Sequence, residues 1–270
     1  MKRHEELRQA IADEVGVPAE KMRTPASYLR QLSEVAVPNY AIAKLRALLG
    51  ANGPFADPDQ RPLFTRMLLA NPHAVLTIAA VSLNRKVDNL VELLEFAPPP
   101  PAAKAGGKAA AAAAAWTAAR VRVLRVAARD PRILKMKPET FKAKLAKLEA
   151  LVGRGHSYAM DMVHSKPALM ACYSSDLLAA KMALLKSVAE GDASWAAELE
   201  YAEPARMAQL LTAGMDKLAR LRYLSAKKMT SQSMQKVIRT SIKDFDAQHR
   251  DFPAWLARQP ARSPTSPWRP

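Results

Sequence analysis

The chain has 270 residues, one cysteine, a formal net charge of +16 and a sequence pI near 10.1. A single cysteine excludes an internal disulfide framework, and no run of 18 apolar residues is present to form a transmembrane helix. Apolar residues make up 49% of the chain and aromatic residues only 6%, which favours an all-α fold of Ala- and Leu-rich helices over a β-sandwich or barrel.

Residues 1–60 are predicted to form an N-terminal helical region, and the sequence leaves open whether it holds divergent repeats. Leu7, Ile11 and Val15 lie on one helix face, and Gly50 suits the C-cap of a later helix. Further apolar faces consist of Tyr28, Leu29 and Leu32, and of Ile42, Leu45, Leu48 and Leu49. The first residues carry several acids and no apolar h-region, so they are not expected to be a secretory or transit segment; either the protein has none, or that segment lies outside this sequence.

A repeated pattern begins with an Xaa-Pro pair. Its copies start at Asp130-Pro131, Lys166-Pro167 and Glu203-Pro204, so successive prolines are 36 and 37 positions apart. A short apolar step follows each proline, and then a helical run that ends in paired leucines. Because proline suits a first helical turn and disfavours helix in the residue before it, each pair is predicted to end one helix and begin the next. Such periodicity is typical of helical repeats.

The predicted array spans residues 61–256, and Asn71-Pro72 opens an earlier copy. The Pro/Ala-rich tract 97–115 is predicted to be an insertion in an inter-helix loop, with its alanines continuing into a helix through Val126. Second helices are predicted at 156–164 and 195–201, with Ser157 and Ser194 as N-caps. The aromatic-richer segment after Leu224 is typical of a terminal unit, and residues 257–270 are predicted to be a disordered tail.

Two segments account for the basic surplus. Residues 120–148 contain ten basic and two acidic side chains, and residues 217–243 contain eight basic and no acidic ones. Arg122, Arg125 and Arg129 are spaced i, i+3, i+7, as are Lys236, Arg239 and Lys243. Cations at this spacing on a helix form stripes that match a phosphate backbone, although a solvated helix face is the ordinary alternative. The candidate nucleic-acid-binding residues are Arg122, Arg125, Arg129, Lys144, Lys147, Lys181, Lys217, Arg220, Lys227, Lys228, Lys236, Arg239 and Lys243.

Four lysines recur at comparable distances from their prolines: Lys86, Lys144, Lys181 and Lys217. Equal positions stack on one side of a repeat array, so these lysines are predicted either to line a groove or to be ordinary polar positions on exposed helices.

Catalytic and metal-binding motifs are not evident. The five histidines form no HExxH pattern, and CxxC and glycine-rich phosphate loops are missing. His156, His164 and Cys172 are spaced by eight, which is not a usual spacing for metal ligands. We therefore expect no enzyme activity, no cofactor and no metal. Four aromatic residues are candidates either for base stacking or for the core: Tyr158, Tyr173, Trp195 and Tyr223.

The passage DPRILKMKPETFKAKLAKLEALVGRGHSYAMDMVHSKPALM, with KLARLRYLSAKKMTSQSM and DFDAQHRDFPAWLA, resembles the mitochondrial transcription termination factor (mTERF) family over about residues 60–256. The resemblance implies a right-handed or otherwise curved α-solenoid with repeats of about 30–37 residues. It also implies a monomer that binds nucleic acid, duplex DNA more than RNA, in a mitochondrion or chloroplast, where family members regulate or terminate transcription.

A second hypothesis is a helical-repeat scaffold that binds RNA or a protein partner in organellar RNA processing or ribosome assembly. A steep loss of nucleic-acid affinity with salt would favour the first hypothesis over the second. A membrane-surface role is not expected, because the chain has no long basic amphipathic helix with a bulky aromatic face.

Overall fold

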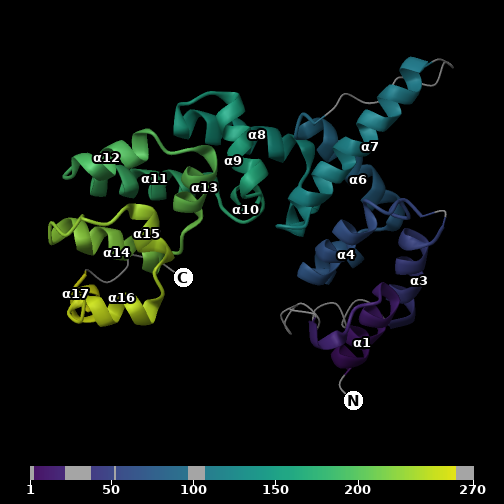
Figure 1. Cartoon of the computed structure of the whole chain (residues 1–270), viewed down its shortest axis with the longest axis horizontal. Coiled ribbons are helices and arrows are strands. Elements are labelled where there is room, and N and C mark those ends of the chain that lie inside the picture. The colour runs from purple at the N-terminus through teal and green to yellow at the C-terminus, as the bar shows by residue number, and fades with distance from the viewer. Residues whose placement is uncertain (1–2, 22–37, 52, 97–106, 260–270) are drawn as a thin grey trace. The chain divides into compact units, whose positions relative to one another are not determined.

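The computed structural model describes residues 3–21, 38–51, 53–96 and 107–259. Every regular element in these ranges is a helix, which confirms the predicted all-α class (Figure 1). None of the helices in the described ranges is long and apolar enough to cross a bilayer. The chain divides into two compact units, residues 1–143 and 144–270, with the division inside one helix.

The first unit holds the elements α1 (Arg3–Val15), η1 (Ala19–Lys21), α3 (Pro38–Leu49), α4 (Arg61–Ala70), α5 (Pro72–Leu76), α6 (Ala80–Leu93), α7 (Gly107–Ala127) and η2 (Pro131–Lys135), followed by the start of α8 (Pro138–Val152). The second unit holds the rest of α8, then α9 (His156–Ser165), α10 (Ala168–Ala171), α11 (Ser175–Ala189), α12 (Ala193–Glu200), α13 (Pro204–Thr212), α14 (Met215–Ala226), α15 (Met234–Arg239), α16 (Ile242–Gln248) and α17 (Phe252–Ala257).

A succession of first helix, second helix and short third helix recurs along the chain, and we call each succession a group. The groups are α3–α4–α5, α6–α7–η2, α8–α9–α10 and α11–α12–α13. In α14–α15 a first helix is followed by the short helix that leads directly into α16. The Xaa-Pro pairs predicted from sequence begin the third elements α5, η2, α10 and α13.

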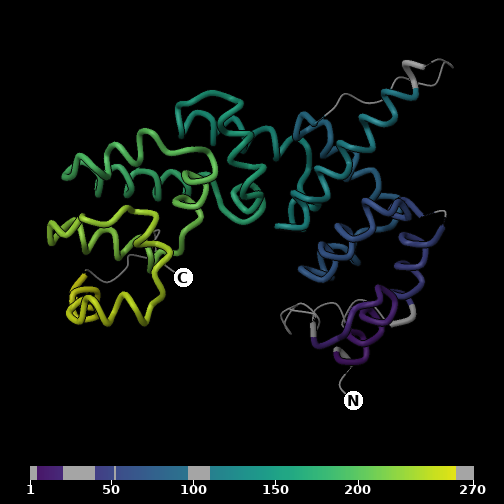
Figure 2. Tube along the Cα trace, in the orientation of Figure 1, coloured from purple at the N-terminus to yellow at the C-terminus, as the bar shows by residue number. Residues whose placement is uncertain are grey.

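Corresponding elements of successive groups pack against each other inside each unit. In the first unit α3 contacts α6, α4 contacts α7, and α5 contacts η2. In the second unit α10 contacts α13, which contacts α15, and α11 contacts α14; Figure 2 shows the last two side by side. The apolar positions predicted from periodicity fill these contacts, since Leu45, Leu185, Leu211, Leu218 and Leu221 are fully buried.

Proline lies at the start of the third helices, as predicted. The two N-cap predictions, Ser157 for α9 and Ser194 for α12, were both wrong. Gly155, with φ of 80°, is the N-cap of α9, and Ser157 lies inside that helix. Asp192 is the N-cap of α12, where its side chain accepts a hydrogen bond from the Trp195 backbone N–H at 2.8 Å. Ser194 therefore also lies inside its helix.

The alanines are helical, as predicted, because α7 runs without interruption from Gly107 through Trp116; the predicted inter-helix loop was therefore wrong for residues 107–115. At the other end of the chain, Tyr223 packs edge-on against Phe245, Phe252 and Trp255, so the aromatic-rich terminal segment closes the second unit. The helix face predicted around Tyr28–Leu32, the first half of the Pro/Ala insertion and the tail from residue 260 lie outside the described residues.

Candidate nucleic-acid interface

The thirteen predicted binding residues differ widely in exposure. Lys144 and Lys217 are half-buried, whereas Lys181 and Arg220 are each only 2% exposed. The exposed residues are Arg122, Arg125, Arg129, Lys147, Lys227, Lys228, Lys236, Arg239 and Lys243.

Two of the predicted stripes do not lie on single helices. Arg122 and Arg125 are exposed on α7, but that helix ends at Ala127, so Arg129 lies in the following turn. Lys236 and Arg239 lie on α15, and Lys243 lies on α16 beyond the caps Thr240 and Ser241. The stripe predictions assumed uninterrupted helices and were wrong for Arg129 and Lys243, although both side chains remain exposed.

Lys181 points into the protein and binds backbone carbonyls. Its Nζ donates hydrogen bonds to the carbonyl oxygens of Leu211 at 3.1 Å and Ala213 at 2.7 Å, and lies 4.3 Å from the centre of the Tyr173 ring. These carbonyls belong to the C-terminal end of α13, which has no helical partners for its last C=O groups. Lys181 thus supplies the missing donors at the end of a third helix.

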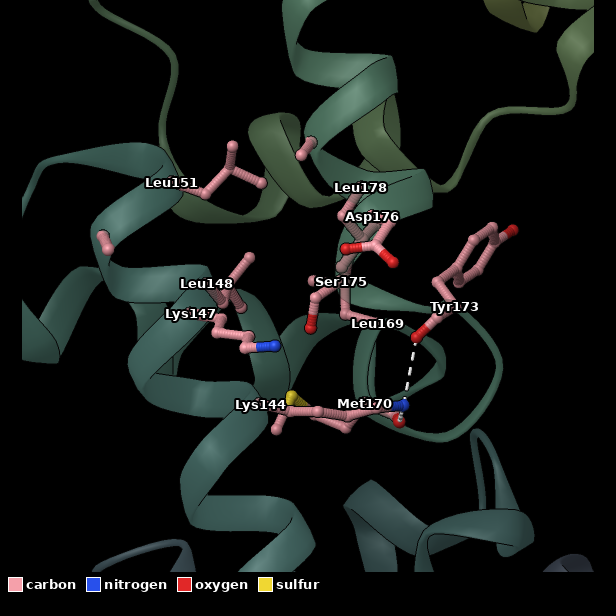
Figure 3. A pocket seen from close by; sticks show the side chains of 12 residues that line it. Lys144, Lys147, Leu148, Leu151, Leu169, Met170, Tyr173, Ser175, Asp176 and Leu178 are labelled. Carbon is pink, nitrogen blue, oxygen red and sulfur yellow. Dashed lines mark hydrogen bonds between the residues drawn. The ribbon is translucent and has the colours of Figure 1, made fainter. Parts of the chain in front are cut away.

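The same arrangement occurs in other groups. Lys144 Nζ donates to the carbonyls of Met170 at 2.7 Å and Tyr173 at 3.0 Å, and Figure 3 shows its side chain reaching across to them from α8. Lys44 Nζ donates to the Leu76 carbonyl at 2.6 Å and to that of Ile78. In the last group, Arg220 Nη1 donates to the Thr240 carbonyl at 2.7 Å.

The carbonyl-binding side chains occupy nearly the same position in their first helices. Lys44, Lys144 and Lys181 are each the seventh residue of a first helix, and Arg220 is the sixth of its own. Lys86 is also a seventh residue, but it is half-buried and binds no carbonyl among the described residues. Lys217 is only the third residue of α14, so it is not equivalent to the lysines with which it was grouped from sequence. Where these side chains are buried, they bind the following third helix rather than line an open groove.

Burial has an electrostatic consequence for these lysines. Desolvation lowers the pKa of Lys44 and of Lys181 from 10.5 to about 8. For Lys135, which lies 3.3 Å from His73 Nδ1, burial also lowers the pKa.

A cationic cavity of about 390 Å³ lies among α13, α14 and α15 in the second unit. We call it the basic cavity. Three cations line it, namely Lys166, Lys217 and Arg239, and no acidic residue does. The remaining lining residues are Gln209, Thr212, Ala213, Gly214 and Ile238.

The basic cavity brings together Lys217 and Arg239, which were both predicted, and adds Lys166, which was not. Lys166 directly precedes Pro167, so its place at the start of a third helix was the only sequence signal for it. Arg239 Nη2 donates to Gln209 Oε1 at 2.7 Å, and Gln235 Nε2 donates to the same oxygen at 3.0 Å. Gln209 thereby holds the guanidinium at the rim of the cavity.

No family model, curated protein or solved structure matches the chain. Function is therefore inferred from the side chains themselves. The most informative are the exposed cations, the basic cavity and a second, mainly apolar cavity.

The apolar cavity has a volume of about 410 Å³ and lies between α8 and the α10–α11 connection (Figure 3). Leu148, Leu151, Leu169 and Leu178 line it, and Lys147 and Asp176 are the charged lining residues besides the carbonyl-bound Lys144. A cavity of this kind suits an apolar side chain of a partner better than a phosphate.

The aromatic candidates for base stacking have structural partners. Trp195 is fully buried and its Nε1 donates to the Gln232 carbonyl at 2.7 Å. The hydroxyls of Tyr158 and Tyr173 donate to the carbonyls of Ala202 and Thr212, respectively. Of the two alternatives for these residues, helix packing is the one observed. Within the ranges that the structure describes, no group of three or more His, Cys, Asp or Glu side chains could hold a metal ion.

Proposed function

We propose that this chain is a nucleic-acid-binding helical-repeat protein, an α-solenoid of the termination-factor type that contacts duplex DNA mainly through its phosphates. The observation that carries the proposal is a set of exposed cations that form no ion pair with any other described residue. They are Arg122, Arg125, Lys147, Lys228, Lys236, Arg239 and Lys243.

Unpaired cations on a folded surface repel one another, and a polyanion relieves that repulsion. Each lysine or arginine that neutralises a phosphate releases condensed counterions, which supplies sequence-independent affinity. The seven cations occur in both compact units, on α7, on α8 and from the end of α14 to α16. The proposal includes a role in organellar transcription, which is supported by the resemblance of the repeats alone.

The test is titration of the full chain with a fluorescently labelled duplex, followed by anisotropy at several salt concentrations between 50 and 200 mM. If the seven cations contact phosphates, the affinity falls by about 10³-fold or more across this range. Arg122→Gln with Arg125→Gln is expected to weaken binding about equally for unrelated sequences, because phosphate contacts carry no base information.

The matched control is Arg8→Gln with Arg46→Gln, since both arginines already pair with acids, Glu5 and Glu14. The control is expected to leave the affinity unchanged. An affinity for duplex DNA that does not depend on salt would contradict the proposal.

The alternative is a scaffold for a protein partner, and the apolar cavity between α8 and the α10–α11 connection favours it. In that case Leu151→Asp, at a partly exposed position in the lining, would abolish the partner interaction and leave any nucleic-acid binding intact. Under the proposal preferred here, Leu151→Asp leaves the salt-dependent binding of duplex DNA unchanged.

A further inference from the structure

We infer that the basic cavity among α13, α14 and α15 is a phosphate-binding site, with Lys166, Lys217 and Arg239 as its cationic ligands. The inference rests on the proposed function only for the source of the phosphate. The residues of the cavity alone support the chemistry of the site. Three cations from three separate segments converge on one cavity whose lining contains no carboxylate. A phosphomonoester dianion would neutralise most of that charge, and a phosphodiester, with one negative charge, would neutralise part of it.

The backbone around the cavity is prepared for an anion. Carbonyl oxygens at the end of α13 would repel a phosphate, but they are already bound by other groups. Lys181 Nζ binds those of Leu211 and Ala213, and the Tyr173 hydroxyl binds that of Thr212 at 2.9 Å. The carbonyl-rich end of α13 is thus electrostatically covered where it meets the cavity.

The following helix adds a favourable field. Gly214, which lines the cavity, is the N-cap of the 12-residue helix α14, and Lys217 lies in its first turn. The positive end of a helix dipole stabilises an anion beside it. The one acid in that turn, Asp216, does not line the cavity and its Oδ2 lies 3.9 Å from Nη2 of the buried Arg220, but its Oδ1 lies against Gly214 and offsets part of this field.

Gln209 gives the site a fixed hydrogen-bonding geometry. Its Oε1 accepts from both Arg239 and Gln235, so its Nε2 amide is the free end of the side chain and has no partner among the described residues. Arg239 is thereby held by one nitrogen while its other N–H groups remain for a ligand. An arginine positioned in this way can bind two phosphate oxygens at once.

A volume of about 390 Å³ exceeds what a bare ion needs, so either of two phosphate sources fits: a phosphodiester within a duplex or a terminal phosphomonoester. The experiment compares three proteins, each as the full chain. One is the wild type, one is the cavity variant Lys166→Gln/Lys217→Gln/Arg239→Gln, and one is the control variant Lys186→Gln/Arg206→Gln/Arg258→Gln. The control removes the same charge from exposed positions outside the cavity.

Each protein is titrated with a 5′-hydroxyl duplex and with the same duplex carrying 5′-phosphates, at several salt concentrations. Each is also melted in 10 mM inorganic phosphate and in sodium chloride of equal ionic strength. For an internal phosphodiester, the slope of log K against log salt is expected to fall by about 1 in the cavity variant alone. For a terminal phosphate, the 5′-phosphorylated duplex is expected to bind at least about tenfold more tightly to wild type than to the cavity variant.

Inorganic phosphate is expected to raise the melting temperature of the wild type and the control variant but not of the cavity variant. Such a rise without any binding of nucleic acid would support the site and overturn the proposed function. If duplex binding is strong and salt-dependent but the cavity and control variants behave alike in every arm, the phosphate site is overturned and the proposed function stands.

Discussion

The buried lysine of α11 offers the sharpest test of how the second unit is held together. In Lys181→Met the side chain keeps an unbranched apolar stem but loses its terminal amine. The carbonyls of Leu211 and Ala213 then lose their donor at the end of α13, inside the protein. Lys186, on the same helix but exposed, provides the control substitution Lys186→Met.

Two opposing effects determine how far Lys181→Met changes the free energy of unfolding. A buried acceptor left without its partner costs about 1–3 kcal/mol, so two carbonyls amount to roughly 2–6 kcal/mol. Against this, methionine avoids the desolvation of an ammonium, which lowers the pKa of Lys181 from 10.5 to about 8 and corresponds to roughly 3 kcal/mol. That cost applies at pH 7 and is largely relieved by pH 9.5, because the buried amine is then mostly neutral and still carries N–H donors.

The assay is urea unfolding followed by circular dichroism at pH 7 and at pH 9.5. We expect Lys181→Met to lower the free energy of unfolding by about 2–4 kcal/mol at pH 9.5, and by about 2 kcal/mol less at pH 7. Lys186→Met should change it by less than about 0.5 kcal/mol at either pH. Equal effects of the two substitutions at pH 9.5 would refute the carbonyl-binding role, and a loss that does not vary with pH would refute the effect of burial on the pKa.

Two further predictions concern the wild-type chain and one helix cap. Because the pKa of Lys44 and of Lys181 is about 8 in the folded chain and 10.5 when unfolded, the unfolded chain binds more protons between these values. The free energy of unfolding is therefore expected to rise from pH 8 to pH 9.5, and a fall over this range would contradict the prediction. Asp192→Ala is expected to lower the melting temperature more than Ser194→Ala, because only Asp192 accepts a hydrogen bond from the Trp195 N–H. Equal decreases in melting temperature would contradict the assignment of Asp192 as the N-cap.

The sequence predicted the starts of helices and their buried positions correctly where residues within one helical turn determine them. Pro72, Pro131 and Pro204 each occupy the first turn of a third element, as the conformational restriction of proline requires. Leucine periodicity likewise placed Leu45 and Leu211 in the core. These features depend on residues within one turn of each other, so they are visible without tertiary information.

The cap of α12 could not be chosen from sequence alone. Asp192 and Ser194 are both good N-cap residues and lie two positions apart. In the structure a second oxygen of Asp192 accepts from the hydroxyl of Thr230, 38 residues further along the chain. That long-range hydrogen bond adds a partner to Asp192 which no local pattern shows.

The sequence predicted that lysines recur at comparable positions, but it did not predict that some of their side chains point into the protein. A lysine at a regular helical position usually faces solvent. The overlooked signal is the apolar neighbourhood of Lys181, whose i−4, i−3, i+3 and i+4 positions are all leucine. A cation on such a face is buried, and a buried cation requires acceptors, which the C-terminal carbonyls of the third helix provide because they have no partner within that helix.

The carbonyl-binding lysines also couple neighbouring groups along the chain. Lys181 extends from the start of one group to the residues that immediately precede Gly214, the N-cap of the next first helix. Its hydrogen bonds therefore fix the conformation from which α14 begins, so opening of α11 also releases the start of α14. Opening of one group in the second unit consequently destabilises the next group. Amide hydrogen exchange at the beginning of α14 should therefore occur together with that of α11.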